Sequence, residues 1–461
     1  MSAQTVAAVA PAVTARAPGK RPSLGRSFLE VWRSGSVWYA LGEMVMAFVF
    51  ALILGAILLV VSNPDILAKA SYLFSQPSDF FVAAWERIAS TYSALAKGSV
   101  GSWYALTETT SRAAPLILAG LGVGLGFRVG LFNIGGQGQA IWGTILAGYV
   151  GFRFDWPMPL HLPAAILAGL LGGAVWAGLA GFLRARFGAN EVITTIMLNY
   201  IASGMLMYLL MTTAFRRPGR TDPISPAITW SATLPRIAGT RLHLGFLIAL
   251  LAALAAWWLL ERTRLGFQIR AVGSNADAAA TAGMSVPFVL TIAMVIAGSL
   301  CGLAGTVIIL MPDSLGGSNP LSVGMVGTVG FDAITVALLG RSKPGGTVLA
   351  GLLFGALNAG AQSMQSVAGT PLELASVLQA LIVMFVAAPM LVRTLAPFLK
   401  RRAIVEVTRL DDSVLDPVVA PSASAASASV ASATASSAPP GDPPAGSAPA
   451  VTAPTSEGGA R

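Results

Sequence analysis

A short tract in the first third of the chain concentrates side chains that bind polar solutes. Residues 131–140 read LFNIGGQGQA and hold the amides Asn133, Gln137 and Gln139, with three glycines among them. Apolar stretches flank the tract on both sides. Hydrocarbon offers no water to backbone groups, so polar or broken backbone persists there only if it is buried in protein or lines a wet cavity. The pattern predicts a pathway for a polar solute; the alternative is a loop just outside the membrane.

Other polar side chains interrupt apolar stretches and are further pathway candidates. Asn199 lies about two turns into one stretch, and Thr195 shares its helical face. Asp332 is an acid inside another stretch, where functional and structural roles are equally open. Glu43 fits better as an inner-surface residue near the start of its helix. Asn190, just before a long apolar run, predicts a helix cap.

A second segment has a composition suited to docking. Residues 270–285 are rich in alanine and predict a short helix, capped by Ser274 or Asn275 and ended by Gly283. A smooth, short helix fits a groove on another protein. The alternative is a plain alanine-rich loop. The candidate docking residues are Arg270, Gly273, Asn275, Ala278, Ala279 and Gly283.

Signatures of catalysis and metal binding are missing from the sequence. It contains no G-x-x-x-x-G-K-[ST] loop, no H-E-x-x-H and no G-x-S-x-G. The two histidines, His161 and His243, stand apart from each other, and Cys301 is the single cysteine. We therefore expect no nucleotide hydrolysis by this chain, no catalytic residues and no metal site.

Composition places the chain in a membrane. Of its 461 residues, 55% are hydrophobic and 11% are charged, whereas soluble domains carry about 25% charged residues. The mean hydropathy is +0.72. The net charge of +9 is spread over many short loops, which is typical of membrane topology and not of nucleic-acid binding.

Hydropathy predicts an all-α, polytopic helix bundle with about ten transmembrane helices. A span needs about 20 apolar residues. With the N-terminus inside, 17 Lys and Arg residues lie near the inner surface and 10 in outer segments, which favours an N-in, C-in topology. The arginine-rich loop 214–242 is an exception to this bias. The expected spans are 39–62, 112–130, 133–152, 162–183, 190–213, 243–260, 287–311, 322–340, 345–366 and 373–396.

The remaining segments give the domain organisation. Residues 1–37 predict a cytoplasmic leader, and 38–400 the membrane domain. Within this domain we expect outer loops at 63–111 and 214–242 and a cytoplasmic loop at 261–286. Residues 401–461 are rich in Ala, Ser and Pro and predict a disordered cytoplasmic tail.

Three motifs together resemble permease subunits of ATP-binding-cassette importers, in the branch that includes ribose, branched-chain amino-acid and nucleoside permeases. Residues 132–139 (FNIGGQGQ) are similar to that branch's F-N-I-G-x-x-G-Q motif. Residues 190–202 (NEVITTIMLNYIA) resemble its nucleoside-type members, and 330–341 (GFDAITVALLGR) fit as well. The segment 270–283 is similar to the family's coupling loop. The resemblance covers about 110–400.

The resemblance implies a division of labour. A separate ATPase subunit would hold ATP and Mg²⁺, and this chain would need no cofactor. A second permease subunit, homologous or identical, and an extracytoplasmic solute-binding protein would complete an importer in the bacterial inner membrane. Nucleosides or related sugars would be the substrates. Amides would bind base and ribose, and Phe127, Phe132 or Trp142 would stack. The alternative is an ion-coupled secondary transporter of a small polar solute.

Overall fold

The computed structural model describes residues 36–313, 317–387 and 394. Most of the predicted leader and the whole predicted tail lie outside these residues. The described part is mostly helical, with one two-stranded sheet. This agrees with the predicted all-α class.

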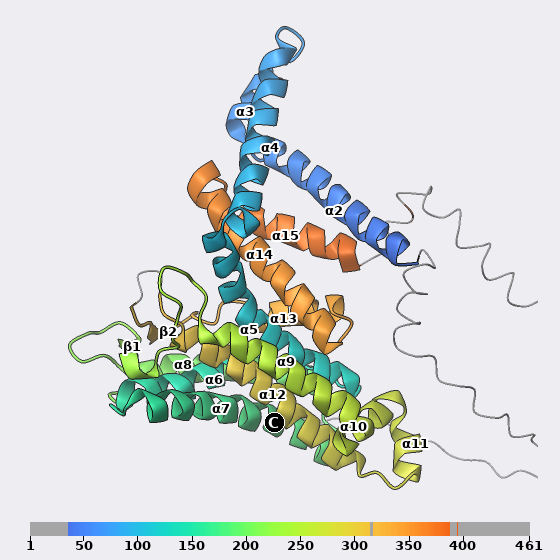
Figure 1. The fold of residues 1–461 in the computed structure, drawn as a ribbon, viewed down its shortest axis with the longest axis vertical. Helices are drawn as coiled ribbons and strands as arrows, with labels where there is room; N and C mark the ends of the chain where they lie inside the picture. The colour runs from blue at the N-terminus through green and yellow to red at the C-terminus, as the bar shows by residue number, and fades with distance from the viewer. Residues whose placement is uncertain (1–35, 314–316, 388–393, 395–461) are drawn as a thin grey trace, which may run out of the picture. The chain divides into compact units, whose positions relative to one another are not determined.

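Long helices follow one another along the chain, and short elements join them (Figure 1). The helices are α2 (Ser36–Val61), α3 (Pro64–Ala70), α4 (Pro77–Val100), α5 (Trp103–Arg128), α6 (Gly136–Arg153), α7 (Met158–Phe187), α8 (Glu191–Met211), α9 (Leu244–Arg262), α10 (Arg264–Ser274), α11 (Ala276–Thr281), α12 (Val286–Leu310), α13 (Val329–Leu339), α14 (Pro344–Ala368) and α15 (Leu372–Ala387).

Six helices in the described part are long and apolar enough to cross a membrane: α5, α7, α8, α9, α12 and α14. A seventh span results if α2 and α3, which meet at a bend of 80°, are counted as one. The membrane helix bundle is therefore confirmed, whereas the count of ten and the N-in, C-in topology are not. The shortfall has a physical reason. The expected span 322–340 contains only the 11-residue helix α13, and 133–152 contains the 18-residue α6, because glycine-rich breaks precede both. The expected span 373–396 contains the 16-residue α15 in the described part of the chain.

Close backbone contacts between glycines hold the centre of the bundle together. Helices α6, α7 and α12 lie side by side (Figure 1). A Cβ atom built on Gly143 of α6 would lie 2.1 Å from the carbonyl oxygen of Gly302 in α12, and one on Gly173 of α7 would lie 2.1 Å from that of Gly298. Only glycine allows this approach, as at other small-residue helix interfaces in membranes.

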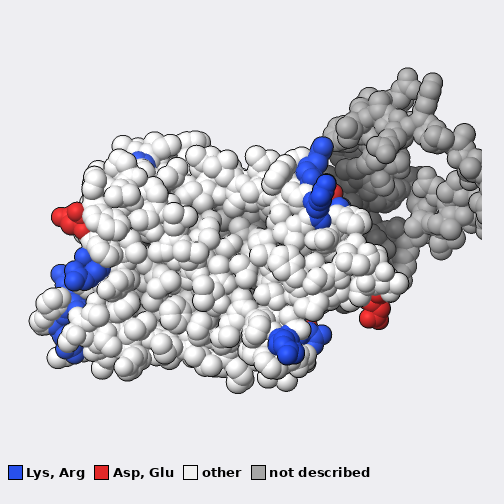
Figure 2. Space-filling view, turned by 90° about the horizontal axis from the view of Figure 1, so that it is seen from below, with Lys and Arg blue, Asp and Glu red and all other residues white. Residues whose placement is uncertain are grey.

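The outward faces of the bundle are apolar. Leu171, Val175 and Leu179 of α7 are 55%, 71% and 43% exposed. Seen from this side, the surface is a broad uncharged band with charged residues at its two ends (Figure 2). An apolar band bounded by charge is the surface that a hydrocarbon layer covers.

Loop 214–242 carries ordered structure at one end of the bundle. It holds the strand β1 (Ile224–Ala227) and a single 3₁₀ turn (Trp230–Ala232), and β1 pairs antiparallel with β2 (Pro320–Ser322). Helices α10 and α11 lie at the opposite end of the bundle (Figure 1). Loop 214–242 and the segment that forms α10 and α11 therefore lie at opposite sides of the apolar band.

Candidate functional site

The amide tract forms a helix break whose side chains bond to one another. Helix α5 ends at Arg128, and α6 begins at Gly136. Asn133 is fully buried, and its Oδ1 accepts hydrogen bonds from the Gly135 N–H at 2.9 Å and from Gln139 Nε2 at 3.1 Å. Buried polar groups need such partners. The polar side chains of this first break therefore find hydrogen-bond partners within the break and the first turn of α6.

Asn199 of α8 ties the same break to a neighbouring helix. Its Nδ2 donates to the Ile134 carbonyl at 3.0 Å, and its Oδ1 accepts from the Gly138 N–H at 2.8 Å. The Asn199 side chain therefore satisfies one backbone carbonyl just before α6 and one backbone N–H in its first turn. Thr195, one turn away, donates to the Glu191 carbonyl within α8 at 2.7 Å.

Gln137 joins this break to a second one, before α13. Its Nε2 donates to the Gly327 carbonyl at 2.7 Å, and its Oε1 accepts from the Gly330 N–H at 2.9 Å. A Cβ atom on Gly330 would lie 2.1 Å from the Gln137 backbone nitrogen. The N-terminal ends of α6 and α13 therefore meet, with one glutamine side chain bonding across them.

The predicted pathway residues thus divide into two groups. The four amides are buried and bond to backbone or to each other. Phe132 is half exposed and packs against Phe127, with 5.1 Å between ring centroids, and Trp142 packs against Trp176 at 4.9 Å. A direct role for these residues in substrate contact remains a prediction.

A cavity of about 460 Å³ opens beside the second break, and Asp332 is the pathway candidate that lines it. Its walls come from α5, the end of α12, the segment before α13, and α14. Pro115, Leu116 and Met325 give it apolar surface, and Asn358 gives it an amide. Its volume lies within the roughly 300–1,000 Å³ of small-molecule sites, which combine an apolar lining with a few polar groups.

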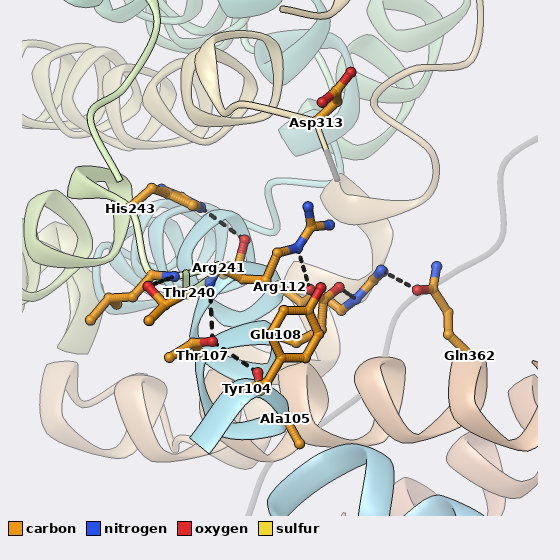
Figure 3. Close-up of polar contacts among 12 residues, drawn as sticks. Tyr104, Ala105, Thr107, Glu108, Arg112, Thr240, Arg241, His243, Asp313 and Gln362 are labelled. Atoms are coloured by element: carbon orange, nitrogen blue, oxygen red, sulfur yellow. Dashed lines mark hydrogen bonds and ion pairs between the residues drawn. The ribbon is translucent and has the colours of Figure 1, made fainter. Parts of the chain in front are cut away.

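An ion-pair network borders this cavity (Figure 3). The Glu108 carboxylate accepts from Arg112 Nε at 2.7 Å and from Arg241 Nε at 2.6 Å. The Glu108 and Arg241 side chains are only 14% and 16% exposed. Arg112 also donates to Gln362 of α14. The network joins α5, the residues before α9, and α14.

A buried histidine packs next to the network. His243 Nδ1 accepts from the Gly245 N–H at 3.0 Å, so Nε2 carries the proton and donates to Ser111 Oγ at 3.0 Å. Burial, together with the nearby positive charge of Arg241, lowers the pKa of His243 to about 4. His243 is therefore neutral at physiological pH and acts as a fixed structural link between α5 and α9.

Comparison with known proteins shows the family of the chain. Residues 105–387 match the family model described as branched-chain amino acid transport system, permease component. The chain belongs to this permease family. The match covers the breaks, the cavity and the ion-pair network. With six or more apolar helices, the permease is a multi-pass membrane protein.

Three curated relatives resemble the permease over most of their length. They are the guanosine ABC transporter permease protein NupP of Bacillus subtilis (40% identical, covering 68% of this chain and 90% of the relative), the nucleoside ABC transporter permease protein NupB of Lactococcus lactis (34%, 69% and 88%) and the glucose ABC transporter permease protein TsgB13 of Haloferax volcanii (33%, 77% and 90%). A second permease protein from each of these organisms matches at 26% to 29% identity. No solved structure matches the permease significantly.

The predicted docking segment forms two short helices of the permease. Asn275 ends α10 and caps α11, because its Oδ1 accepts from the Ala278 N–H at 2.9 Å. Gly283, with a φ of +83°, follows the end of α11. The prediction of a helix capped by Ser274 or Asn275 is confirmed, with Asn275 as the cap. The contact with an ATPase remains a prediction.

Two other docking candidates of the permease hold the segment against the bundle. A Cβ atom on Gly273 would lie 2.1 Å from the Arg128 carbonyl oxygen, so α10 packs directly on the end of α5. Ala279 is buried, whereas Ala278 is exposed. Arg270 Nη1 lies 4.0 Å from the Glu261 carboxylate. Movement of this segment would therefore reach α5 and the break that follows it.

Sequence reasoning did not place Glu108, Arg112 and Arg241 of the permease among the site residues. One local signal was available, because Glu108 and Arg112 are four residues apart at the start of an apolar stretch. Arg241 lies 133 residues from Glu108. Without the fold, nothing in the sequence pairs these two residues.

Proposed function

We propose that this permease is the membrane subunit of an ATP-binding-cassette importer for nucleosides or related sugars in a bacterial inner membrane. A separate ATPase subunit binds ATP and Mg²⁺ and hydrolyses ATP, and this chain needs no cofactor. An extracytoplasmic binding protein delivers the solute. The chain has its N- and C-termini inside, and the shorter helices α6, α13 and α15 complete a set of ten membrane segments.

The observation that carries the proposal is the cavity beside the two helix breaks. It combines the Asn358 amide and the Asp332 and Glu108 carboxylates with the apolar surface of Leu116 and Met325. Carboxylate and amide oxygens accept hydrogen bonds from hydroxyl and amino groups, and apolar side chains cover a ring. A neutral solute with several hydroxyls, such as a nucleoside or a sugar, satisfies both. The similarity to nucleoside and glucose permease proteins supports the same substrate class.

The amide tract has a supporting part in this proposal. Asn133, Gln137 and Asn199 maintain the two breaks by bonding to backbone that a continuous helix would satisfy alone, and Gln139 bonds to the Asn133 side chain. When the ATPase closes, these bonds exchange and expose the amides to the solute. The transporter thereby presents two cavity shapes of different affinity.

We infer that the second permease subunit is homologous but not identical. Each of three organisms has two permease proteins that match this chain, one at 33% to 40% identity and one at 26% to 29%. Such a pair is what a heterodimeric pathway requires. Co-purification of this chain with a second permease of the same family would test the inference, and a stable complex containing only this chain would contradict it.

The direct test of function is uptake of radiolabelled guanosine, adenosine, uridine and ribose by cells with and without the gene. ATP is depleted in one arm while the proton gradient is kept. We expect deletion to abolish uptake of at least one nucleoside or sugar, and ATP depletion to abolish the uptake of cells that keep the gene. Uptake that survives ATP depletion and follows an ion gradient would instead favour a secondary transporter.

A further inference from the structure

A second cavity, of about 610 Å³, lies at the α10–α11 end of the bundle and is strongly basic. It is formed where α5 and α9 end and where α14 begins. Arg128, Arg262 and Lys343 line it, against a single acid, Glu261. The Glu261 carboxylate also lies 4.0 Å from Arg270 Nη1. The cavity therefore has a net positive charge, and neither the substrate cavity nor the docking helix α11 contributes to it.

The turn between α13 and α14 precedes Lys343, which lines this cavity. Arg341 and Ser342 both have a φ of +51°, and they are the non-glycine residues with positive φ in the described part of the chain. Arg128 Nε donates to the Ser342 carbonyl at 2.9 Å and so fixes the turn. Such backbone conformations persist only where the surroundings hold them. The turn brings Lys343 next to Arg128.

The start of α14 adds backbone donors to the same cavity. No side chain caps this helix, and Pro344 is its first residue. Gly345 and Gly346 follow and line the cavity, and a Cβ atom on Gly345 would meet nothing within 4 Å. The first N–H groups of a helix lack intrahelical partners and favour an anion. Three cations and this helix end thus converge on one open space.

An exposed apolar stripe continues from the cavity along α9. Arg262 lies 5.7 Å from the centroid of the Trp257 ring, which lines the cavity. Trp257, Leu254, Leu250 and Leu247 are spaced three or four residues apart and so share one helical face. They are 43%, 59%, 37% and 51% exposed. The cavity therefore opens directly onto the apolar band.

We propose that this cavity binds the phosphate of an anionic membrane lipid, with an acyl chain along the Trp257–Leu247 face of α9. Basic pockets between helices at the cytoplasmic surface suit such headgroups. A free phosphate compound would use the cations but not the apolar stripe, so the stripe favours a lipid. The proposal relies on the cytoplasmic placement of this end in the proposed topology. It does not depend on the transported substrate.

The test measures lipid binding by the purified full-length chain in detergent. A fluorescent phosphatidylglycerol is titrated against it, with fluorescent phosphatidylcholine as the neutral probe. The double variant Arg262→Gln/Lys343→Gln removes two cations and leaves the Arg128 contact intact. We expect it to weaken phosphatidylglycerol binding about thirty-fold, since a cation near an anionic surface contributes about 1 kcal/mol. Binding of phosphatidylcholine should not change.

A single variant tests the site independently of these cations. Gly345→Asp places a carboxylate in open space at the start of α14, where an acid favours the helix. We expect it to reduce phosphatidylglycerol binding at least tenfold while the thermal unfolding temperature is kept. The matched control is Arg186→Gln/Arg264→Gln, which removes two exposed arginines outside this cavity. It should bind phosphatidylglycerol like the wild type.

Three results would overturn the proposal. In the first, the control loses as much binding as the cavity variants, which would indicate general surface charge. In the second, Gly345→Asp binds phosphatidylglycerol like the wild type. In the third, millimolar inorganic phosphate displaces the lipid completely, which would identify a free phosphate site. Because the assay needs neither substrate nor ATPase, failure of the uptake experiment would leave its result unaffected.

Discussion

The Glu108 carboxylate of α5 and the Arg241 guanidinium before α9 lie 2.6 Å apart, although 133 residues separate them in the chain. The backbone N–H of Arg241 also donates to Thr107 Oγ1 at 3.1 Å. One residue pair therefore fixes the loop that enters α9 against the start of α5, at the edge of the cavity that Asp332 and Asn358 line. Any rearrangement that opens this edge must either break the ion pair or move both residues together.

The first prediction concerns this ion pair. Glu108→Gln leaves two arginines without their shared carboxylate, and we expect a loss of about 1.5 to 3 kcal/mol in stability. Uptake should fall as well, since the cavity edge is no longer held. Thermal unfolding and uptake of Glu108→Gln, Arg241→Gln and the double variant would form a cycle. Additive losses would show that the two residues are not coupled.

Asn358 should affect transport without affecting folding. It lines the cavity, and within the described part of the chain its amide makes no hydrogen bond to another protein group. We expect Asn358→Ala to raise the KM for uptake about tenfold, the effect of a lost hydrogen bond of roughly 1.4 kcal/mol, with unchanged thermal stability. Gln365→Ala, an exposed position on the same helix, is the control. Equal effects of the two variants would count against the cavity as the substrate site.

Asn199, unlike Asn358, should affect both stability and transport. Its side chain bonds to both the Ile134 carbonyl and the Gly138 N–H, which a substitution by alanine would leave unsatisfied. We expect Asn199→Ala to cost about 1 to 3 kcal/mol of stability and to reduce uptake. Thermal unfolding and the amount of folded protein in the membrane would be measured together with uptake. Transport equal to wild type would show that Asn199 has no role in the pathway.

His243 predicts a pH dependence of stability. Its pKa in the folded protein is about 4 against an ordinary value of 6.5, so the folded state resists protonation. Above pH 6.5 this residue leaves stability unchanged. Between pH 6.5 and 4 the unfolded chain takes up a proton that the folded chain does not, and up to about 3 kcal/mol is lost.

The matched variant for this test is His243→Asn, which can still cap α9 through its side chain. Its thermal unfolding temperature should fall less steeply than that of the wild type between pH 6.5 and 4. Parallel slopes for the two proteins would show that His243 is not the group that titrates.

The close helix packing gives the last prediction. A methyl group at Gly143 would lie 2.1 Å from the Gly302 carbonyl oxygen, so Gly143→Ala must force α6 and α12 apart. We expect a loss of about 1 to 3 kcal/mol. Gly204→Ala, in the middle of α8 with nothing within 4 Å, should be neutral or stabilising. Similar thermal unfolding temperatures for the two variants would contradict the packing argument.

The sequence by itself determined the class of the protein and much of its local structure. Low charge and long apolar stretches identified a membrane helix bundle, and the motifs at 132–139 and 190–202 identified its family, because hydrophobicity and short motifs are local properties. Asn190 was predicted as one helix cap and either Ser274 or Asn275 as another, and the caps are Asn190 and Asn275. Caps are local as well, because a side chain two or three residues away satisfies the free N–H groups.

Only the tertiary structure decided how far each helix extends and which polar residues share a cavity. The hydropathy of 322–340 cannot distinguish a full span from the short helix α13, since both are apolar. The ion pair of Glu108 with Arg241 and the bridge from Gln137 to Gly330 join residues more than 130 positions apart. Such contacts depend on how helices pack, and a linear sequence does not state which faces meet.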